Sequence, residues 1–351
     1  MGLPCLDGAA GYGGGVNDTS TSSSVRWRRI AIFYGIALGW AVLIGLAFYL
    51  LGQRDLSAGA AAWVGPVMAV LYMPVPLVAA LITEKIVGEG YLMRRIFTRK
   101  LGRQLLRTLV AVPLVIAALI LSMVGLSWLA GTVAGISGAG QVLFSVDDLV
   151  ANVIAITGTS MDAATVAKLT AATPSLWGLL AITFGMALVV GFTINGLFAF
   201  GEEYGWRGWL ADELAPLGPV WANLITGVMW GLWHAPVILL GYNYGSYRLP
   251  GVVAMIGWCV AGSFLLWRMR QVTGTVLSAA VTHGAINGFA GIFLVVLADP
   301  NRLLAAPMGA VGIASVAVVA LVLWLIGRPA SDQAAAPVAE TPAAETPVAQ
   351  N

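Results

Sequence analysis

Long apolar stretches alternate with short polar segments along most of the chain. A helix needs about 20 apolar residues to cross a bilayer, and it must satisfy its own backbone polar groups there. Each stretch is therefore predicted to be a transmembrane helix. The pattern predicts an all-α polytopic membrane protein with about eight transmembrane helices. They are placed at residues 30–51, 61–83, 108–130, 178–201, 220–241, 251–267, 273–297 and 308–327.

Composition supports this class and sets the domain limits. The chain is 59% hydrophobic and 10% charged, whereas a soluble domain carries about 25% charged residues. The first apolar stretch is of full span length, so no cleavable signal peptide is predicted. Small polar residues dominate 1–25, and Ala, Pro, Glu and Thr repeat through 329–351. Both are predicted to be disordered tails that flank a membrane domain at 26–328.

Positive charge is distributed unequally between the two sides of this arrangement. If both termini and the even-numbered loops share one side, that side holds 14 of the 18 Lys and Arg residues. Loops rich in Lys and Arg stay in the cytoplasm, so both termini are predicted to be cytoplasmic. The basic loop Lys85–Arg107 is interpreted as a segment held against anionic lipid, and nucleic acid is not expected as a partner. The four cations of the other side are Arg54, Lys168, Arg248 and Arg302.

Two adjacent carboxylates, Glu202 and Glu203, follow the fourth apolar stretch. Burying an ionisable side chain in a membrane costs about 2.5–3.5 kcal/mol even on a lenient scale, so such residues are functional candidates. Arg207 lies one turn after Glu203 on the same helix face, which favours an ion pair between them. Glu202 points about 100° away in a helix of 3.6 residues per turn. Glu202 is therefore free to face another group, whereas Glu203 and Arg207 are expected to support the site.

The chain has two histidines, and both lie in apolar stretches. His234 follows Trp230 by one turn, and His283 precedes Asn287 by one turn. A single histidine in a membrane commonly makes an interhelical hydrogen bond. Two of them, beside a Glu pair and an Asn, favour a catalytic site instead. Counting about 1.5 Å per residue from the cytoplasmic helix ends places Glu202 and both histidines at a similar depth, about 15 Å.

A carboxylate, two imidazoles and a carboxamide support two kinds of hydrolysis. Glu202 can take a proton from water that His234 orients, while His283 and Asn287 donate hydrogen bonds to a developing oxyanion. Glu202, His234 and His283 are equally three zinc ligands with an open fourth position. The sequence contains no His-Glu-x-x-His helix and no Gly-x-Ser-x-Gly elbow. The residues leave the metal-free and the zinc mechanism both open.

Three short motifs on successive predicted helices resemble those of the CPBP family. This family, also called ABI, groups CAAX-processing endopeptidases with bacteriocin-processing and immunity proteins. The resemblance covers about residues 178–297, and it departs from many members at Trp230, where they have Phe. The motifs are Glu202-Glu203-x-x-x-Arg207, Trp230-x-x-x-His234 and His283-x-x-x-Asn287.

The resemblance implies an intramembrane endopeptidase that cleaves a membrane-associated protein or peptide. It implies that Glu202 and His234 activate water and that His283 and Asn287 hold the oxyanion, with the metal question left open. The Ala- and Gly-rich composition favours a bacterial cell membrane and an unprenylated substrate peptide or a small secreted precursor. One alternative is a non-catalytic immunity or scaffold protein on the same fold. Another is a transporter or proton relay, although residues 30–177 show no repeat of the motifs.

Water and an unfolded peptide must both reach the site. We therefore expect a conical polar cavity among the fourth to seventh helices, opening to the cytoplasm with a second, lateral opening to lipid as an alternative. Gly227, Gly231, Gly284 and Gly288 either leave room for this cavity or allow close helix packing. The loop at 131–177 is expected to hold an interfacial helix at Val146–Ile156.

Overall fold

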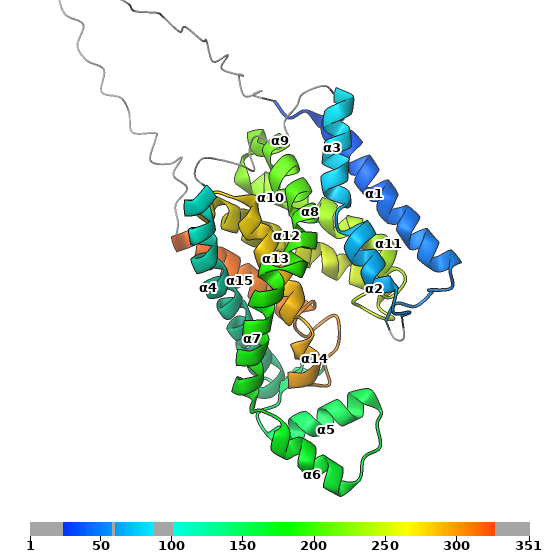
Figure 1. Cartoon of the computed structure of the whole chain (residues 1–351), viewed down its shortest axis with the longest axis vertical. Helices are drawn as coiled ribbons and strands as arrows, with labels where there is room; N and C mark the ends of the chain where they lie inside the picture. Colours follow the sequence, from blue (N-terminus) through cyan, green and yellow to red (C-terminus); the bar gives the residue numbers. More distant parts are fainter. Residues whose placement is uncertain (1–23, 58–59, 88–100, 327–351) are drawn as a thin grey trace, which may run out of the picture.

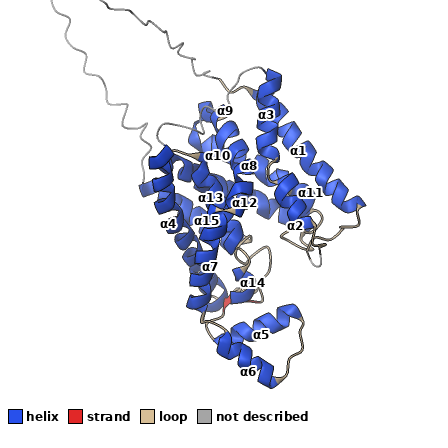
Figure 2. Ribbon diagram, in the orientation of Figure 1, coloured by secondary structure: helices blue, strands red, loops and turns tan. Residues whose placement is uncertain are grey.

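The structure is a computed structural model, and it describes residues 24–57, 60–87 and 101–326. These residues are almost entirely helical (Figure 1, Figure 2). The elements up to the long loop are α1 (Trp27–Leu50), α2 (Val64–Val67), η1 (Met68–Tyr72), α3 (Val75–Val87), α4 (Leu101–Ser127) and η2 (Trp128–Val133). The loop region holds β1 (Gln141–Val142), α5 (Val146–Thr157) and α6 (Ala163–Ala172). The remaining elements are α7 (Leu176–Phe192), α8 (Ile194–Glu203), η3 (Tyr204–Leu210), α9 (Ala211–Glu213), η4 (Ala215–Leu217), α10 (Gly218–Trp233), α11 (Ala235–Ile238), α12 (Arg248–Thr273), α13 (Val276–Phe289), α14 (Ile292–Val296), β2 (Leu297–Ala298) and α15 (Ala310–Ile326).

The predicted fold class, an all-α polytopic membrane protein, is confirmed. Within the described residues, five helices are long and apolar enough to cross a membrane, or six if the bent pair α6 and α7 counts as one span. Large apolar side chains on the outside of the bundle stay exposed, among them Leu43, Leu114 and Leu197. A soluble monomer rarely exposes so much contiguous apolar surface, whereas lipid covers it in a membrane. Each of the eight predicted stretches coincides with described helix, but the number of spans stays a prediction.

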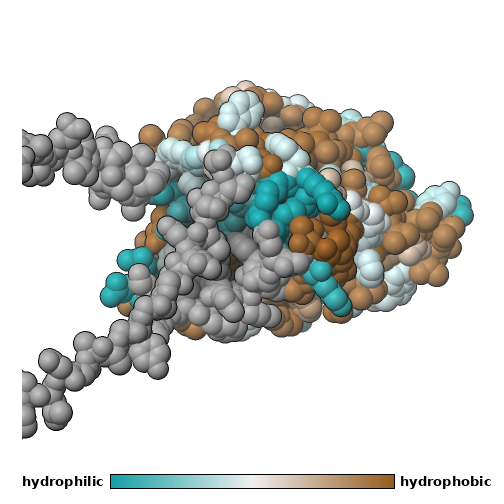
Figure 3. All heavy atoms as spheres, turned by 90° about the horizontal axis from the view of Figure 1, so that it is seen from above, coloured by the Kyte–Doolittle hydropathy of each residue, from teal (hydrophilic) through white to brown (hydrophobic). Residues whose placement is uncertain are grey.

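One end of the bundle gathers basic residues, and we call it the basic end. Here α1 and α4 begin, and α3, α9, α12 and α15 end. Hydrogen bonds join these helix ends, for example from Gln104 Nε2 to the carbonyl of Gly274 at 2.7 Å and from Arg268 Nε to the carbonyl of Leu323 at 3.0 Å. Figure 3 views the molecule from this end and shows hydrophilic surface surrounded by hydrophobic surface. The predicted tails and most of the basic loop lie outside the described residues.

The opposite end, which we call the loop end, is formed by residues 52–57, 239–247 and 297–309 together with 134–144. Backbone hydrogen bonds link these loops, from Leu56 N to Leu240 O at 2.6 Å and from Asn301 N to Gly138 O at 2.8 Å. The strands β1 and β2 pair antiparallel over two residues each. The loops therefore form one connected layer across the bundle.

The α5–α6 hairpin extends beyond the loop end (Figure 1). A helix is present as α5 where one was expected at Val146–Ile156, and Ser145 caps it by accepting a hydrogen bond from Asp148 N–H, while its interfacial position stays a prediction. The second helix, α6, was not predicted. Its cap is Asp162, which accepts a hydrogen bond from Thr165 N–H at 2.8 Å. This hydrogen bond lowers the pKa of the Asp162 carboxyl, because it favours the charged form.

Close backbone approach holds the centre of the bundle together. Helix α12 packs against α10, α13, α15 and α4, and α13 packs against α7 and α8. A Cβ added at Gly227 would lie 2.5 Å from the Cα of Val260, and one at Gly284 would lie 2.5 Å from the nitrogen of Gly196. Gly231 and Gly288 are equally crowded. Of the two readings of these glycines, the structure supports close helix packing, since small residues let helix backbones approach.

Candidate active site

The two adjacent carboxylates point to different partners. The helix continues past α8 through η3 to α9, so Glu202 and Glu203 lie inside the bundle rather than at a helix end. Glu203 Oε1 pairs with Arg207 Nη1 at 3.1 Å, as one-turn spacing predicted. Glu202 Oε2 instead accepts a hydrogen bond from Trp230 Nε1 at 3.0 Å. Both glutamates are buried. The two glutamates therefore differ in their partners, while the difference in their roles stays a prediction.

Glu203 also contacts His283, which sequence reasoning missed. Its Oε1 lies 2.8 Å from His283 Nδ1. A carboxylate can only accept, so Nδ1 carries the proton in this contact and the ring orientation is set by Glu203. His283 lines the cavity described below, which leaves Nε2 as the ring nitrogen that can act there. The sequence predicted Arg207 as the partner of Glu203 and did not predict His283. Spacing along one helix cannot reveal a partner on another helix.

His234 is oriented by its own helix. Its Nδ1 lies 2.9 Å from the carbonyl oxygen of Trp230, one turn earlier. A carbonyl only accepts, so Nδ1 donates and Nε2 of the neutral ring keeps its lone pair. A lone pair at Nε2 can accept a proton from water or from a substrate. Cys259 Sγ lies 4.0 Å from the same Nδ1 and is buried.

Trp230 contacts Glu202, Arg207 and both histidines, although sequence reasoning noted it only as the aromatic residue of its motif. Its ring centroid lies 5.8 Å from that of His234 and 5.5 Å from that of His283. The Arg207 guanidinium lies over the ring at 4.1 Å from its centroid. A cation over an indole face is attracted by the ring quadrupole. The sequence signal for this role was the substitution of Trp for Phe, because only Trp brings an N–H that can reach Glu202.

Glu202, His234, His283 and Asn287 line one cavity of about 650 Å³. That volume lies in the range of about 300–1,000 Å³ common for ligand sites. Asn287 lies one turn beyond His283 on α13 and is exposed to the cavity. All four predicted catalytic residues are therefore brought to one space, whereas Glu203 and Arg207 lie behind it. The similar depth predicted for Glu202, His234 and His283 holds only approximately. His234 lies deeper than the count assumed, because α10 begins at Gly218 and His234 follows its whole 16-residue length.

The direction in which the cavity opens was predicted wrongly. The expectation was an opening on the side of the termini, which is the basic end. The cavity instead extends from Glu202 to the loop end. Its outer wall is formed by residues of three loops, namely Ser57, Tyr242, Asn243, Asn301, Arg302 and Met308. The depth of each residue was counted from the helix ends in the sequence. Such a count does not show at which end of the bundle packed side chains close the cavity.

The three predicted zinc ligands do not form a ready metal site. Among the described residues, no three His, Cys, Asp or Glu side chains come together in a way that could hold a metal ion. Glu202 Oε2 is engaged by Trp230, and Nδ1 of each histidine is engaged by Glu203 or by a carbonyl. The donor set does not fit zinc in this arrangement, so the chemistry below is built on the protein's own groups.

Comparisons with known proteins agree with this arrangement. Residues 177–289 match the family described as Rce1-like, type II CAAX prenyl endopeptidase. A stretch of 97 residues is 28% identical to the CAAX prenyl protease 2 of Methanococcus maripaludis and covers 26% of this chain. It covers 36% of that protein, so the chain spans about a third of the length of this relative.

The matched residues contain all three motifs and the helices α8, α10, α12 and α13 around the cavity. They also contain Trp230, which the cluster is built around. The resemblance seen in the motifs is thus confirmed by an independent match over the same part of the chain. Residues 177–289 of this integral membrane protein are thus similar to the CAAX protease (CPBP) family.

Proposed function

We propose that the protein is an intramembrane endopeptidase in which Glu202 and His234 activate water and His283 and Asn287 stabilise the oxyanion. The observation that carries this proposal is the shared cavity, which joins four polar side chains from three helices in an otherwise apolar bundle. Burying such groups is costly in a membrane, and a site that hydrolyses a peptide bond makes use of all of them. The substrate class is a membrane-associated protein or peptide.

The geometry supports a division of labour. Glu202 is held by the Trp230 N–H and faces the cavity, where its carboxylate can take a proton from water as the water attacks the scissile carbonyl. The Nε2 lone pair of His234 can orient the same water, and it can then carry the proton that Glu202 has taken to the leaving amine. In its doubly protonated form His283 donates through Nδ1 to Glu203 and through Nε2 into the cavity. Asn287 adds a second donor for the oxyanion.

The test is cleavage by the purified full chain in detergent. Two fluorogenic peptides serve as probes, a prenylated CAAX peptide and its unprenylated counterpart. We expect Glu202→Gln to abolish cleavage while its thermal unfolding matches that of the wild type, because an amide cannot accept the proton from water. The matched control is Asp147→Asn, an exposed carboxyl on α5 far from the cavity.

Two results would overturn the proposal. One is a Glu202→Gln variant that still cleaves. The other is a folded wild-type chain that cleaves neither probe and whose cells show no Glu202-dependent cleavage in an N-terminal survey of membrane and secreted proteins. The second result would favour the non-catalytic immunity or scaffold function.

A further inference from the structure

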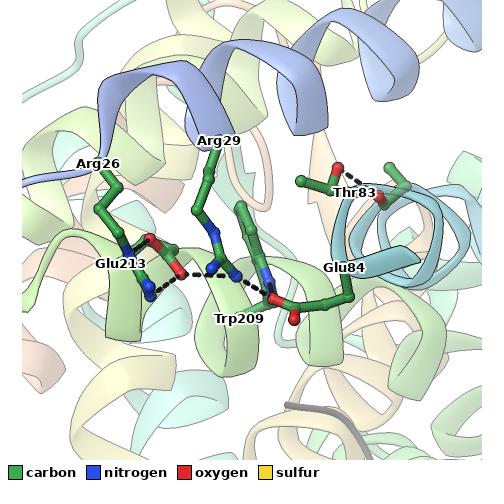
Figure 4. A network of polar contacts seen from close by, with 7 residues as sticks. Arg26, Arg29, Thr83, Glu84, Trp209 and Glu213 are labelled. Carbon is green, nitrogen blue, oxygen red and sulfur yellow. Dashed lines mark hydrogen bonds and ion pairs between the residues drawn. The ribbon is translucent and has the colours of Figure 1, made fainter. Parts of the chain in front are cut away.

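Side chains close the basic end of the bundle on one side of the site. Arg26 pairs with Glu213 at 2.6 Å, and Arg29 lies 3.3 Å from the same carboxylate (Figure 4). Arg29 also pairs with Glu84, which accepts a further hydrogen bond from Trp209 Nε1 at 2.5 Å. These residues come from α1, α3, η3 and α9. None of these side chains lines the cavity, so the network closes this end rather than forming part of the site.

A layer of aromatic side chains fills the space beside this network. Phe33 stacks on Trp209 with ring centroids 4.8 Å apart and meets Trp206 edge-on at 5.3 Å. Trp206 in turn meets Trp233 at 6.0 Å, and all four side chains have 0% exposure. Trp206 follows Glu202 by one helical turn toward the basic end. A substrate in the cavity must therefore lie on the other side of Glu202, against the loops of the loop end.

The loop 239–247 contributes Tyr242 to this part of the cavity. The backbone on both sides of Tyr242 is fixed. Its N–H donates to the carbonyl of Val237 at 3.1 Å. Its two neighbours, Gly241 and Asn243, have φ angles of 93° and 62°, a left-handed region that Gly and Asn adopt more readily than most residues. The turn therefore holds the Tyr242 side chain in a defined place in the cavity wall.

The loop carries three tyrosines, and two of them have a partner for their hydroxyl. Tyr244 donates to the carbonyl of Met308 at 3.0 Å, and Tyr247 accepts a hydrogen bond from Asn301 Nδ2 at 2.7 Å. The half-buried Tyr242 makes no side-chain hydrogen bond to any residue that the structure describes. A tyrosine hydroxyl withdrawn from bulk water usually finds a partner. The partner of Tyr242 must therefore come from the contents of the cavity.

The Tyr242 phenol lies within electrostatic reach of Glu202, the proposed base. Burial, and after it the negative charge of Glu202, raise the pKa of the phenol, so the hydroxyl keeps its proton and can donate it in a hydrogen bond. When Glu202 takes a proton from the attacking water, the oxygen of the adjacent scissile carbonyl gains negative charge. A neutral donor close to Glu202 is well placed to stabilise that oxygen.

We propose that Tyr242 is a further catalytic residue, whose hydroxyl donates a hydrogen bond to the oxygen of the scissile carbonyl as it becomes an oxyanion. Tyr242 acts from the loop 239–247, whereas His283 and Asn287 act from α13, so two separate elements hold the oxyanion. The proton stays on the phenol oxygen, and no covalent bond to Tyr242 forms or breaks. This inference rests on the proposed endopeptidase function.

Tyr242→Phe in the purified full chain tests this role, because phenylalanine keeps the ring and lacks only the hydroxyl. Removing one oxyanion donor typically lowers kcat by about 10²–10³-fold, and we expect a fall of that order. KM should stay close to that of the wild type, since the hydrogen bond strengthens only in the transition state. Tyr244→Phe is the matched control, because it removes a hydroxyl that holds the same loop but does not line the cavity. It should keep the wild-type kcat per folded molecule.

A second measurement separates stabilisation of the oxyanion from the fold of the loop. A phosphinic analogue of the cleaved peptide has a tetrahedral, negatively charged centre in place of the scissile carbonyl, whereas a reduced-amide analogue has a methylene there. In calorimetric titrations, Tyr242→Phe should weaken binding of the phosphinic analogue by a factor similar to the loss in kcat/KM. Binding of the reduced-amide analogue should not change. The cleaved peptide is whichever fluorogenic probe is hydrolysed, or a peptide that spans a site found in the N-terminal survey.

Three results would overturn the inference and leave the proposed function intact. Tyr242→Phe could keep the wild-type kcat although Glu202→Gln is inactive. Tyr244→Phe could lose as much activity as Tyr242→Phe, or Tyr242→Phe could bind both analogues equally weakly, and either result would mean that the shape of the loop matters rather than the hydroxyl. A wild-type chain that cleaves neither probe and shows no Glu202-dependent cleavage in cells would overturn the inference together with the proposed function.

Discussion

At the scale of single residues, the site depends on hydrogen bonds that fix each reactive group from behind. Glu202 is held by Trp230, His283 by Glu203, and His234 by a backbone carbonyl. Side chains that are held in one orientation need less reorganisation when charge develops in a transition state. Substitutions behind the cavity should therefore weaken catalysis by degrees, whereas substitutions in the cavity abolish it.

Trp230→Phe tests the hydrogen bond to Glu202. Phenylalanine keeps an aromatic ring beside Arg207 and the two histidines but lacks the N–H. A hydrogen bond to a charged group contributes about 1.5–3 kcal/mol, so we expect peptide cleavage to fall by about ten- to a hundredfold. The loss should be partial, since an aromatic ring remains beside Arg207 and the two histidines. Trp177→Phe, on the exposed face of α7, is the control. Unchanged kinetics in Trp230→Phe would contradict the orienting role.

Glu203→Gln tests the buried carboxylate behind His283. The change leaves Arg207 buried without an anion, and breaking a buried pair in this way typically costs about 3–5 kcal/mol. We expect a lower unfolding temperature in detergent. Activity per folded molecule should also fall, because His283 loses the acceptor that orients it, yet it should stay above the level of Glu202→Gln. A Glu203→Gln variant with less activity than Glu202→Gln at equal folding would mean that the base is Glu203.

At the scale of elements, the site is assembled by helices that touch at glycines. The α10–α12 contact brings His234 near Cys259, and the α13–α8 contact brings His283 to Glu203. Both contacts need short distances between backbones, which a side chain at Gly227 or Gly284 would prevent. The spacing of small residues along a helix therefore determines how closely the polar groups of the candidate site can approach one another from different helices.

Gly227→Ala tests the α10–α12 contact away from the reactive groups. Its new Cβ would lie 2.5 Å from the Cα of Val260, so one backbone must move. Overpacking of this kind typically costs about 1–3 kcal/mol, and we expect a lower unfolding temperature in detergent. Gly185→Ala is the matched control, because nothing lies within 4 Å of its added Cβ. Equal stability of the two variants would show that α10 and α12 can separate without cost.

At the scale of the whole molecule, the two ends of the bundle differ in construction. The basic end is closed by ion pairs that join α1, α3 and α9, while the loop end surrounds the mouth of the cavity. A bundle closed at one end and open at the other holds a water-filled site without letting water pass through the membrane. The closed end should therefore contribute to stability more than to catalysis.

Arg29→Met tests the closed end. Methionine keeps much of the side-chain volume but removes the charge that lies between Glu84 and Glu213. Two buried carboxylates then lose their shared cation, and we expect a loss of about 3–5 kcal/mol in unfolding free energy. Arg28→Met is the control, since Arg28 is exposed on the same turn. Peptide cleavage by the Arg29→Met protein that remains folded should match the wild type. Equal stability of the two variants would show that the network does not hold the end together.

The sequence by itself determined the class of fold and the identity of the polar residues in the site. Apolar stretches of span length can only be helices in a bilayer, and the one-turn spacing of Glu203 and Arg207 produced the expected pair. Both signals are local, because they depend on periodicity within one helix. The same locality explains why α5 could be predicted from its apolar periodicity, whereas α6, which buries no side chain, could not.

Only the tertiary structure decided which groups meet and from where they are reached. The contact of Glu203 with His283 joins residues 80 positions apart, and the hydrogen bond of Trp230 to Glu202 joins residues 28 apart. Neither follows from spacing within a helix. The opening of the cavity depends on which end the aromatic layer and the ion pairs fill, and that is a property of packing between helices. Charge along the chain predicted which end faces the cytoplasm, but side-chain packing decided which end the cavity reaches.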